Sequence, residues 1–165
     1  MENKPIKRSQ HILQLSKDHH FTLLFSWKIR QGLKQCVDSE RIKKYVFHFW
    51  QSDMHAHFRE EEEILFAPLK DDKVQKAIEE HKQIKEQIDI ALKSSGDEAA
   101  KQLLLLVNIV GAHVRYEERE LFPHLEKTLT EEQLVSIGAQ LKDELVKDEY
   151  ADEFWIKTNN PVCLY

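Results

Sequence analysis

The sequence contains little that would bend or interrupt a helix. Among its 165 residues are only four glycines and four prolines, whereas charged residues make up 32% of the chain. Few glycines and prolines together with many Glu, Lys, Leu and Gln residues favour helix over sheet. We therefore predict an all-α protein. The length suits a single domain over residues 1–165, with a core large enough to fold without cross-links.

Other absences exclude whole classes of function. No stretch approaches the roughly 20 consecutive apolar residues that cross a membrane, and the first ten residues, MENKPIKRSQ, lack the hydrophobic region of a secretory signal. The net charge is −5 with both signs mixed along the chain, so the basic stripe of a nucleic-acid binder is missing. Cys36 and Cys163 are far apart and outside any CxxC pair, so we expect two reduced thiols. We therefore predict a cytoplasmic protein that binds neither nucleic acid nor membranes.

Apolar spacing predicts helices along nearly the whole chain. Five are expected, over about residues 9–36, 39–68, 72–93, 97–127 and 130–149. Four long helices with short connections are typical of an up-down-up-down four-helix bundle, here over about residues 9–128. An additional C-terminal helix and an irregular tail would fill residues 130–165.

Several residues have the chemistry of helix ends. Ser9 is expected to cap the first helix. Gly96 is expected to stop the third helix and Asp97 to cap the fourth. Thr130 and Gln133 have the spacing of a capping box at the start of the last helix.

One motif is written twice. HFREEEEILFAPL begins at His57 and HVRYEERELFPHL begins at His113, so that each histidine is followed four residues later by a glutamate, Glu61 or Glu117. Apolar residues precede both histidines at the same offsets: Phe47, Trp50 and Met54 before the first, and Leu103, Leu106 and Val110 before the second. Each histidine and glutamate is therefore expected on the apolar stripe, facing the core one turn apart. A carboxylate there is costly unless it is paired or bound to a metal.

The first and third helices each offer a further histidine. His81 lies among apolar residues at helical spacing, and His20 does the same and shares with His81 the pattern H-x-x-[LI]-x-x-x-[WI]. His19 has Thr22 and Ser26 at the corresponding positions. We therefore expect His20 to face the centre, with His19 as the alternative.

The predicted inward set contains four imidazoles and two carboxylates: His20, His57, Glu61, His81, His113 and Glu117. Two ions, each held by two histidines and bridged by both carboxylates, would use every group. This donor set suits iron, with manganese or zinc as substitutes, and the absence of a nearby thiolate argues against a structural zinc site. An open position on each ion could bind a small molecule such as O2.

Other residues are assigned supporting roles or left open. Glu62 and Glu118 directly follow the predicted bridging residues and could hold the histidines from behind, or be exposed. His124 lies two turns beyond Glu117, so we expect a supporting or core role for it. A single His-x-x-x-Glu would more often be a packing feature, and a metal-free helical bundle is the alternative to the metal site. Two copies, together with an inward histidine on each remaining helix, favour the metal.

At these residues the sequence resembles the hemerythrin family, and more closely its hemerythrin-like (HHE) cation-binding domains. The matching segments are HHFTLLFSW, HFREEEEILF, EEHKQI and HVRYEERELFP. The resemblance implies a four-helix bundle with a non-haem, carboxylate-bridged di-iron centre (Fe2+/Fe3+), in which His20, His57, His81 and His113 are terminal ligands and Glu61 and Glu117 are bridges.

The sequence differs from the oxygen-carrying hemerythrins at two places. Lys85 stands where they have a second third-helix histidine, and Glu117 follows His113 by four residues where they have an aspartate after five. The pattern looks more like branches linked to iron sensing, to O2 or NO response, and to repair of iron centres. We expect a protein that binds O2 or a related diatomic ligand for sensing, storage or scavenging. The alternatives are a di-iron enzyme that reduces O2, peroxide or NO with a separate reductase, and an iron donor or iron-centre repair protein.

Overall fold

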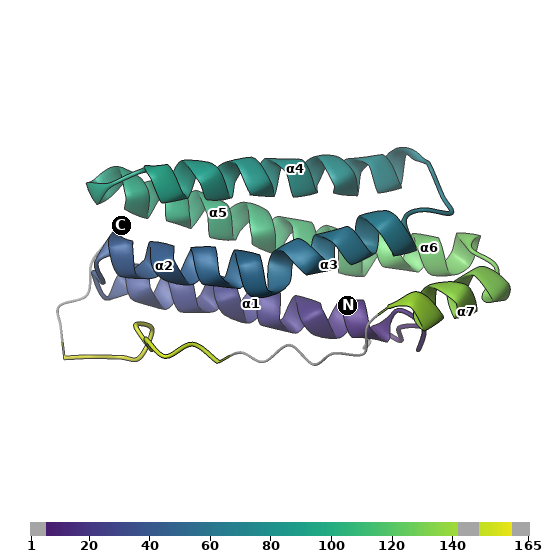
Figure 1. Cartoon of the computed structure of the whole chain (residues 1–165), viewed down its shortest axis with the longest axis horizontal. Coiled ribbons are helices and arrows are strands. Elements are labelled where there is room, and N and C mark those ends of the chain that lie inside the picture. Colours follow the sequence, from purple (N-terminus) through teal and green to yellow (C-terminus); the bar gives the residue numbers. More distant parts are fainter. Residues whose placement is uncertain (1–5, 142–148, 160–165) are drawn as a thin grey trace, which may run out of the picture.

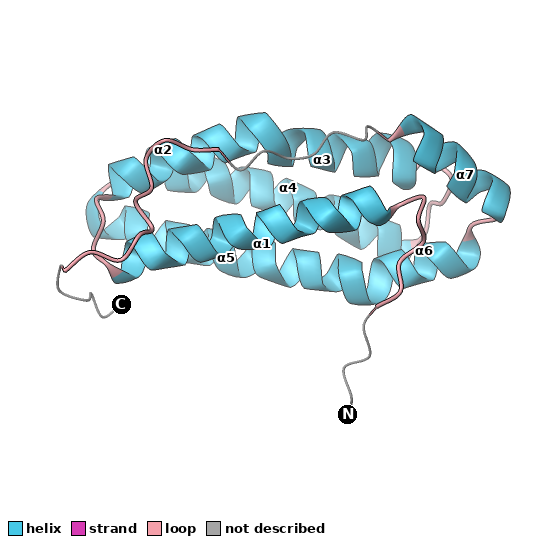
Figure 2. Ribbon diagram, turned by 90° about the horizontal axis from the view of Figure 1, so that it is seen from below, coloured by secondary structure: helices cyan, strands magenta, loops and turns pink. Residues whose placement is uncertain are grey.

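Four long helical segments run antiparallel in the computed structural model, which describes residues 6–141 and 149–159 (Figure 1, Figure 2). The first and third segments are single helices, α1 (Leu13–Lys34) and α4 (Asp72–Lys93). The second consists of α2 (Ser39–Phe49), the π-helix η1 (Trp50–Met54), α3 (His55–Glu60) and the π-helix η2 (Glu61–Leu65). The fourth consists of α5 (Gly96–Tyr116), the π-helix η3 (Glu117–Leu121) and α6 (Phe122–Thr128), and α7 (Glu131–Gln140) follows at one end of the bundle. The predicted all-α bundle is confirmed, and the described residues include no strand.

The predicted helix ends are partly correct. The capping box of Thr130 and Gln133 is present at the start of α7. The prediction for Ser9 is wrong, because α1 begins at Leu13, and the Ser9 hydroxyl accepts a hydrogen bond from the backbone N–H of His11 instead. The prediction for Gly96 is also wrong: this residue opens α5 with a positive φ of 57°, a conformation that glycine adopts without strain.

Two further boundaries differ from the prediction. Ser95, and not Asp97, is the N-cap residue of α5. The last helix was expected to reach about residue 149, but α7 ends at Gln140 and Glu149 is not helical. Residues 142–148 of that expected helix lie outside the described part of the chain.

The first helix is rotated relative to the prediction. Its buried face carries Leu15, His19, Thr22, Ser26 and Ile29, a seven-residue repeat of positions separated by four and three. Of the four residues expected around His20, Leu13, Leu23 and Trp27 are exposed and Leu24 is half-buried. On this inward face the Thr22 hydroxyl donates to the backbone carbonyl of Asp18 at 3.3 Å. The buried Ser26 hydroxyl has no hydrogen-bond partner among the described residues.

A π-turn shifts the register of the second segment. Met54, the last residue of η1, and His57 after it are buried as predicted. Upstream of η1, Phe47 is 49% exposed, and Val46 and Phe49 are buried in its place. A π-helix inserts one extra residue per turn, so the buried positions run from Phe49 to Met54 with a spacing of five. The equal offsets of the two motif copies therefore fail before η1.

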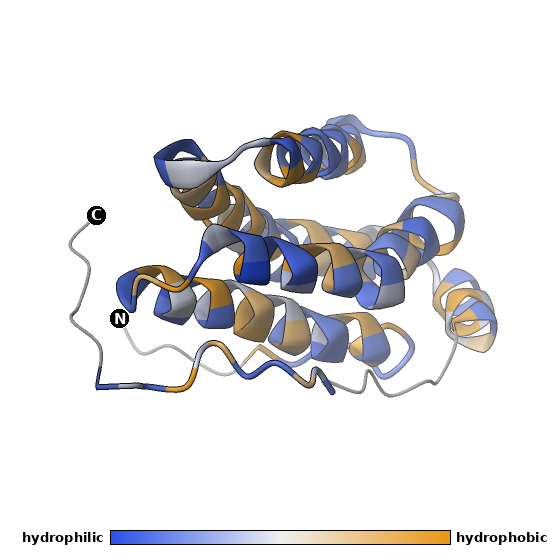
Figure 3. Cartoon of the chain, turned by 60° about the vertical axis from the view of Figure 1, so that its left-hand side comes forward, coloured by the Kyte–Doolittle hydropathy of each residue, from blue (hydrophilic) through white to orange (hydrophobic). Residues whose placement is uncertain are grey.

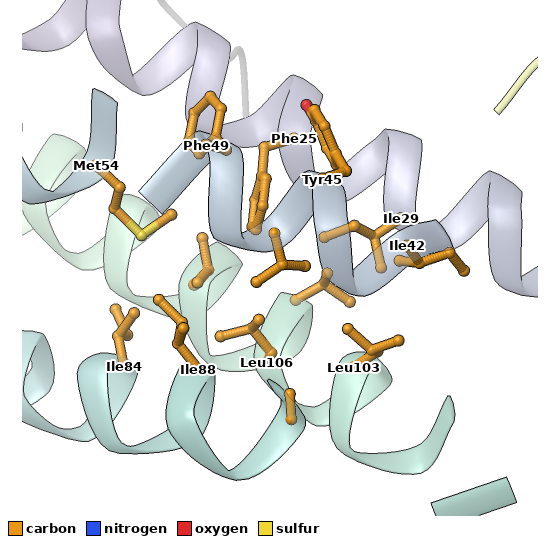
Figure 4. Packing of buried hydrophobic residues seen from close by; sticks show 14 of the residues in the cluster. Phe25, Ile29, Ile42, Tyr45, Phe49, Met54, Ile84, Ile88, Leu103 and Leu106 are labelled. Carbon is orange, nitrogen blue, oxygen red and sulfur yellow. The ribbon is translucent and has the colours of Figure 1, made fainter. Parts of the chain in front are cut away.

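Two apolar clusters fill the interior and leave a polar layer between them. The larger cluster joins α1, α2, α4 and α5 through Phe25, Ile42, Ile88, Leu106 and their neighbours (Figure 4). The smaller cluster packs the other end around Leu15, Ala77, Phe122 and neighbours. On α1 and α4 the residues between the two clusters include His19 and His81. Hydrophobic residues otherwise line the sides of the helices that face one another (Figure 3).

The described part of the C-terminal tail, residues 149–159, packs as an irregular segment over α1 and α2 (Figure 2). Phe154 is buried against Tyr45, with ring centroids 5.3 Å apart, and Arg41 donates two hydrogen bonds to Asp152. Cys36 is disulfide-bonded, so the prediction of a reduced thiol is wrong at that position, and Cys163 lies outside the described residues. None of the described helices is both long and apolar enough to span a membrane.

Candidate metal centre

Six buried side chains meet in the polar layer between the two apolar clusters. They come from all four helical segments: His19, His57, Glu61, His81, His113 and Glu117. They form two groups of four that share both glutamates. One group contains His19 and His57, the other contains His81 and His113, and within each group the candidate ligand atoms lie within 4.8 Å of one another.

The distances from histidine nitrogen to carboxylate oxygen are similar in the two groups. In the first, Nε2 of His57 lies 3.1 Å from Oε1 of Glu61, and Nε2 of His19 lies 3.0 Å from Oε2 of Glu117. In the second, Nε2 of His81 lies 3.2 Å from Oε2 of Glu61. The second group is completed by His113, whose Nε2 lies 3.2 Å from Oε2 of Glu117. Every imidazole thus presents Nε2 to the centre, and each carboxylate spans both groups.

These inward atoms lack hydrogen-bond geometry although they lie close together. Among the described residues, the Nε2 atoms of all four histidines and all four carboxylate oxygens of Glu61 and Glu117 are buried without a hydrogen-bond partner. Buried polar atoms are normally satisfied, and a carboxylate without compensation is costly in an apolar interior. Eight convergent nitrogen and oxygen donors fit a pair of cations. We therefore interpret this layer as a candidate metal centre.

Without a cation, protons would have to balance the two carboxylates. Burial and the charge of Glu117 act to raise the pKa of Glu61, but His57 and His19 outweigh them and hold it below its ordinary value. Burial opposes protonation of His57, yet the charge of Glu61 and the Asp18 carboxylate, 3.4 Å from Nδ1, raise its pKa to about 9. Protons and metal ions therefore compete for the same sites.

A second layer of carboxylates holds the histidines from behind. Three contacts are short: Nδ1 of His19 to Glu118 at 2.6 Å, Nδ1 of His81 to Glu62 at 2.8 Å, and Nδ1 of His113 to Glu80 at 2.8 Å. The fourth is longer, with Nδ1 of His57 lying 3.4 Å from Asp18. A carboxylate that accepts the Nδ1 proton leaves the lone pair on Nε2. This layer therefore selects the tautomer that a metal requires.

The structure brings together five of the six predicted inward residues and corrects the sixth. His20 is exposed and lies outside both groups, and His19, the stated alternative, occupies its place. The pattern shared by His20 and His81 is out of register by one residue. In the correct register His19 corresponds to His81, and an acidic residue directly precedes each of them, Asp18 before His19 and Glu80 before His81. Sequence reasoning missed both acids, although this repeated dipeptide was a visible signal.

The supporting residues also take definite places. Glu62 and Glu118 do hold histidines from behind, since each points to the neighbouring helix, away from the shared carboxylates. His124 is not part of the centre: its Nε2 pairs with Asp71 at 2.6 Å. Lys85 lies 3.8 Å from Glu62 and is 40% exposed, so the position of a fifth histidine in oxygen carriers is turned away from the centre.

Both shared glutamates begin a π-turn. Glu61 is the first residue of η2 and Glu117 the first residue of η3, so the two halves of the site have the same backbone device. Short π-turns within α-helices occur frequently at functional sites. The repeat seen in the sequence is therefore a repeat in three dimensions, with each half supplying two histidines and one shared carboxylate.

The sequence pattern of the hemerythrin HHE cation binding domain matches residues 11–125, which cover every residue of the two groups. The chain belongs to the hemerythrin HHE cation-binding domain family. No curated protein and no solved structure matches the chain. Family membership and the two buried groups of histidines and glutamates together support a cation-binding site in this hemerythrin-like domain.

Proposed function

We propose that the protein holds two iron ions in a carboxylate-bridged, non-haem centre that binds O2 or a related diatomic ligand such as NO. The observation that carries this proposal is the sharing of Glu61 and Glu117 by both four-residue groups. Two bridging carboxylates with two imidazoles on each side are a donor set that suits iron, although manganese or zinc could take its place. A pair of iron ions bound there would supply reversible ligand binding and electron exchange.

The residues of the chain prepare this chemistry in three ways. The four Nε2 lone pairs and the shared carboxylates provide four donors to each ion, fewer than the six that iron commonly takes, so that an added ligand has room. The charges of Glu61 and Glu117 offset those of the cations. The carboxylates behind the histidines accept the Nδ1 protons and thereby fix the rings.

Aromatic side chains pack directly on the histidines. Phe58 stacks on His81 with ring centroids 3.9 Å apart and 13° between the planes, and Phe122 stacks on His19 at 5.3 Å. Such packing restricts water and charged solutes more than a small neutral molecule. An apolar surrounding with open positions on the metal supports a diatomic ligand as the molecule that binds.

Sensing, storage and scavenging all fit this site, and a di-iron enzyme that receives electrons from a separate reductase, or an iron donor, remains an alternative. These roles differ in what happens after the ligand binds, so kinetic measurements separate them. A cytoplasmic location stays a prediction from the sequence.

The deciding experiment is metal analysis and an optical spectrum of protein purified anaerobically from iron-supplemented cells and then exposed to air. We expect about two irons per chain and new near-ultraviolet and visible bands in air. Bands that bleach when O2 is removed would support binding, whereas bands that persist, with turnover in the presence of a chemical reductant, would support an enzyme. Iron that a weak chelator removes quickly would favour an iron donor. A chain without metal after iron supplementation would overturn the proposal.

A further inference from the structure

The two four-residue groups of the centre differ in the cation that lies behind them, and in one group this cation is a buried arginine. In each four-residue group, one histidine is held from behind by the glutamate that directly follows a shared carboxylate. Glu118 holds His19, and Glu62 holds His81. The cation next to Glu62 is the half-exposed Lys85 at 3.8 Å. The cation next to Glu118 is Arg8, whose side chain is 3% exposed.

Each of the three side-chain nitrogens of Arg8 has a polar partner. Its guanidinium donates to the Glu118 carboxylate at 2.9 Å and to the Glu118 backbone carbonyl at 2.7 Å. It also forms an ion pair with Glu126, while Nε donates to Ser16 at 3.1 Å. The backbone N–H of the next residue, Ser9, donates to the same Glu126 carboxylate at 2.7 Å. A buried arginine with this many partners fixes the carboxylates that it contacts.

A second contact links Arg8 to the same histidine. Its guanidinium carbon lies 5.2 Å from the centre of the Phe122 ring, and that ring stacks on His19 with 22° between the planes. Phe122 thus contacts both Arg8 and His19. On the opposite half Phe66 stacks on His81 in the same manner, at 6.1 Å and 23°, but no cation–π contact to Phe66 occurs within the described chain.

We propose that Arg8 is a positioning residue for His19, acting through Glu118 and Phe122, and that it selectively supports one of the two metal positions. The inference rests on the two-ion centre of the proposed function. The contacts of Arg8 hold Glu118 in place. Glu118 can then accept the Nδ1 proton of His19 and leave Nε2 as the donor to the metal. Arg8 precedes residues 11–125, the part of the chain that matches the family, so the N-terminal segment adds this support to the shared bundle.

The test is a Co2+ titration against a competing chelator, in wild type and in three variants, each first checked for helical content by circular dichroism. For Arg8→Gln we expect one of the two binding steps to weaken about tenfold. This is the lower end of the range for loss of a partner behind a metal-bound histidine, because Glu118 itself remains. Arg8→Lys should restore part of that loss, because the charge returns without the forked geometry. Lys85→Gln, the matched change on the other half, should leave both steps within about threefold of wild type, because Lys85 is half-exposed.

The outcomes separate this inference from the proposed function. If the wild type binds two Co2+ ions and Arg8→Gln binds both as tightly as the wild type does, the role of Arg8 is overturned and the two-ion centre is not. A wild-type chain that binds no Co2+ overturns the two-ion centre as well. Equal losses in Arg8→Gln and Lys85→Gln would also overturn the proposal, since they would indicate a general charge effect.

A measurement on the unmodified chain applies even if Arg8→Gln does not fold. Because coupling between two sites is reciprocal, metal binding should hold Arg8 more firmly in place. Trypsin cleavage after Arg8, followed by mass spectrometry, should therefore be slower in the Co2+-loaded wild type than in the metal-free protein, and His19→Ala should abolish the difference. Equal cleavage rates in the loaded and metal-free wild type would contradict the proposal.

Discussion

His19 and Glu118 are 99 residues apart in the sequence, yet Nδ1 of His19 lies 2.6 Å from Oε1 of Glu118. This contact joins the first helix to the π-turn of the fourth and selects which of two adjacent histidines faces the centre. Because neighbouring residues on a helix point in directions about 100° apart, His19 and His20 cannot both face inward. The choice between them is therefore a matter of packing between distant parts of the chain.

The adjacent histidines offer a matched pair of variants. We expect His19→Ala to lose one of two bound metal ions or to weaken its binding strongly, because His19 is one of the two imidazoles in its group. His20→Ala should retain both ions, since His20 is exposed. Metal content per chain after gel filtration checks both. Full metal content in His19→Ala, or loss in His20→Ala, would contradict the geometry.

The shared carboxylates predict a difference between glutamate and histidine variants. Glu117 belongs to both groups, whereas His113 belongs to one. Glu117→Ala should therefore abolish or greatly weaken binding of both ions, and His113→Ala should mainly affect one. Glu63, which pairs with Arg59 at the surface and is 62% exposed, provides the control: Glu63→Ala should bind as wild type. Metal titration would refute the bridging arrangement if Glu117→Ala lost only one ion.

The metal-free protein should become less stable on both sides of a window between about pH 4.5 and pH 6.5. Burial opposes protonation of His57, but the charge of Glu61 and the nearby Asp18 carboxylate raise its pKa to about 9. Because this pKa is raised on folding, the stabilisation is complete below about pH 6.5 and is lost as the pH rises through about 9, on the order of 3 kcal/mol in free energy of unfolding. Burial acts to raise the pKa of Glu118, but the contact with His19 has the larger effect and brings it down to about 2. The stabilisation from ionised Glu118 is therefore lost as the pH falls from about 4.5 toward 2.

Urea unfolding with a chelator present, followed by circular dichroism, checks this pH dependence. The loss of stability between pH 6.5 and pH 9 should shrink in His57→Gln. With metal bound the trend over the same range should disappear or reverse, because metal ions displace the protons. Equal unfolding free energies for the metal-free wild type at pH 6.5 and pH 9 would show that the buried imidazole is not held in its charged form.

Two helical glycines provide a matched test of the C-terminal segment. A Cβ on Gly32 would lie 2.8 Å from a ring carbon of Phe154, whereas a Cβ on Gly111 would meet nothing within 4 Å. We expect Gly32→Ala to destabilise the protein by about 1–3 kcal/mol through overpacking, and Gly111→Ala to stabilise it by up to about 1 kcal/mol through helix propensity. Thermal unfolding measures both. A stabilising Gly32→Ala would mean that Phe154 does not pack tightly against α1 in solution.

Local sequence pattern was enough to predict the all-α bundle and most of the centre. Helical periodicity with few glycines and prolines was enough for the four long segments. The two copies of His-x-x-x-Glu lie inside single helical segments, where positions four apart share a face whatever packs against them. For this reason His57, Glu61, His113 and Glu117 could be assigned from local pattern alone.

Tertiary structure decided what local pattern could not. Near the two adjacent histidines of α1, Leu23 and Trp27 face outward. Their apolarity pointed to His20, and only packing against Glu117 and Glu118 selects His19. The regular helical spacing of Phe47, Trp50 and Met54 concealed the π-turn at η1. Only packing shows that Phe47 is exposed and that Phe49 is buried instead. The partners behind the histidines, including Arg8, come from other segments of the chain, and their position depends on how four helices pack together.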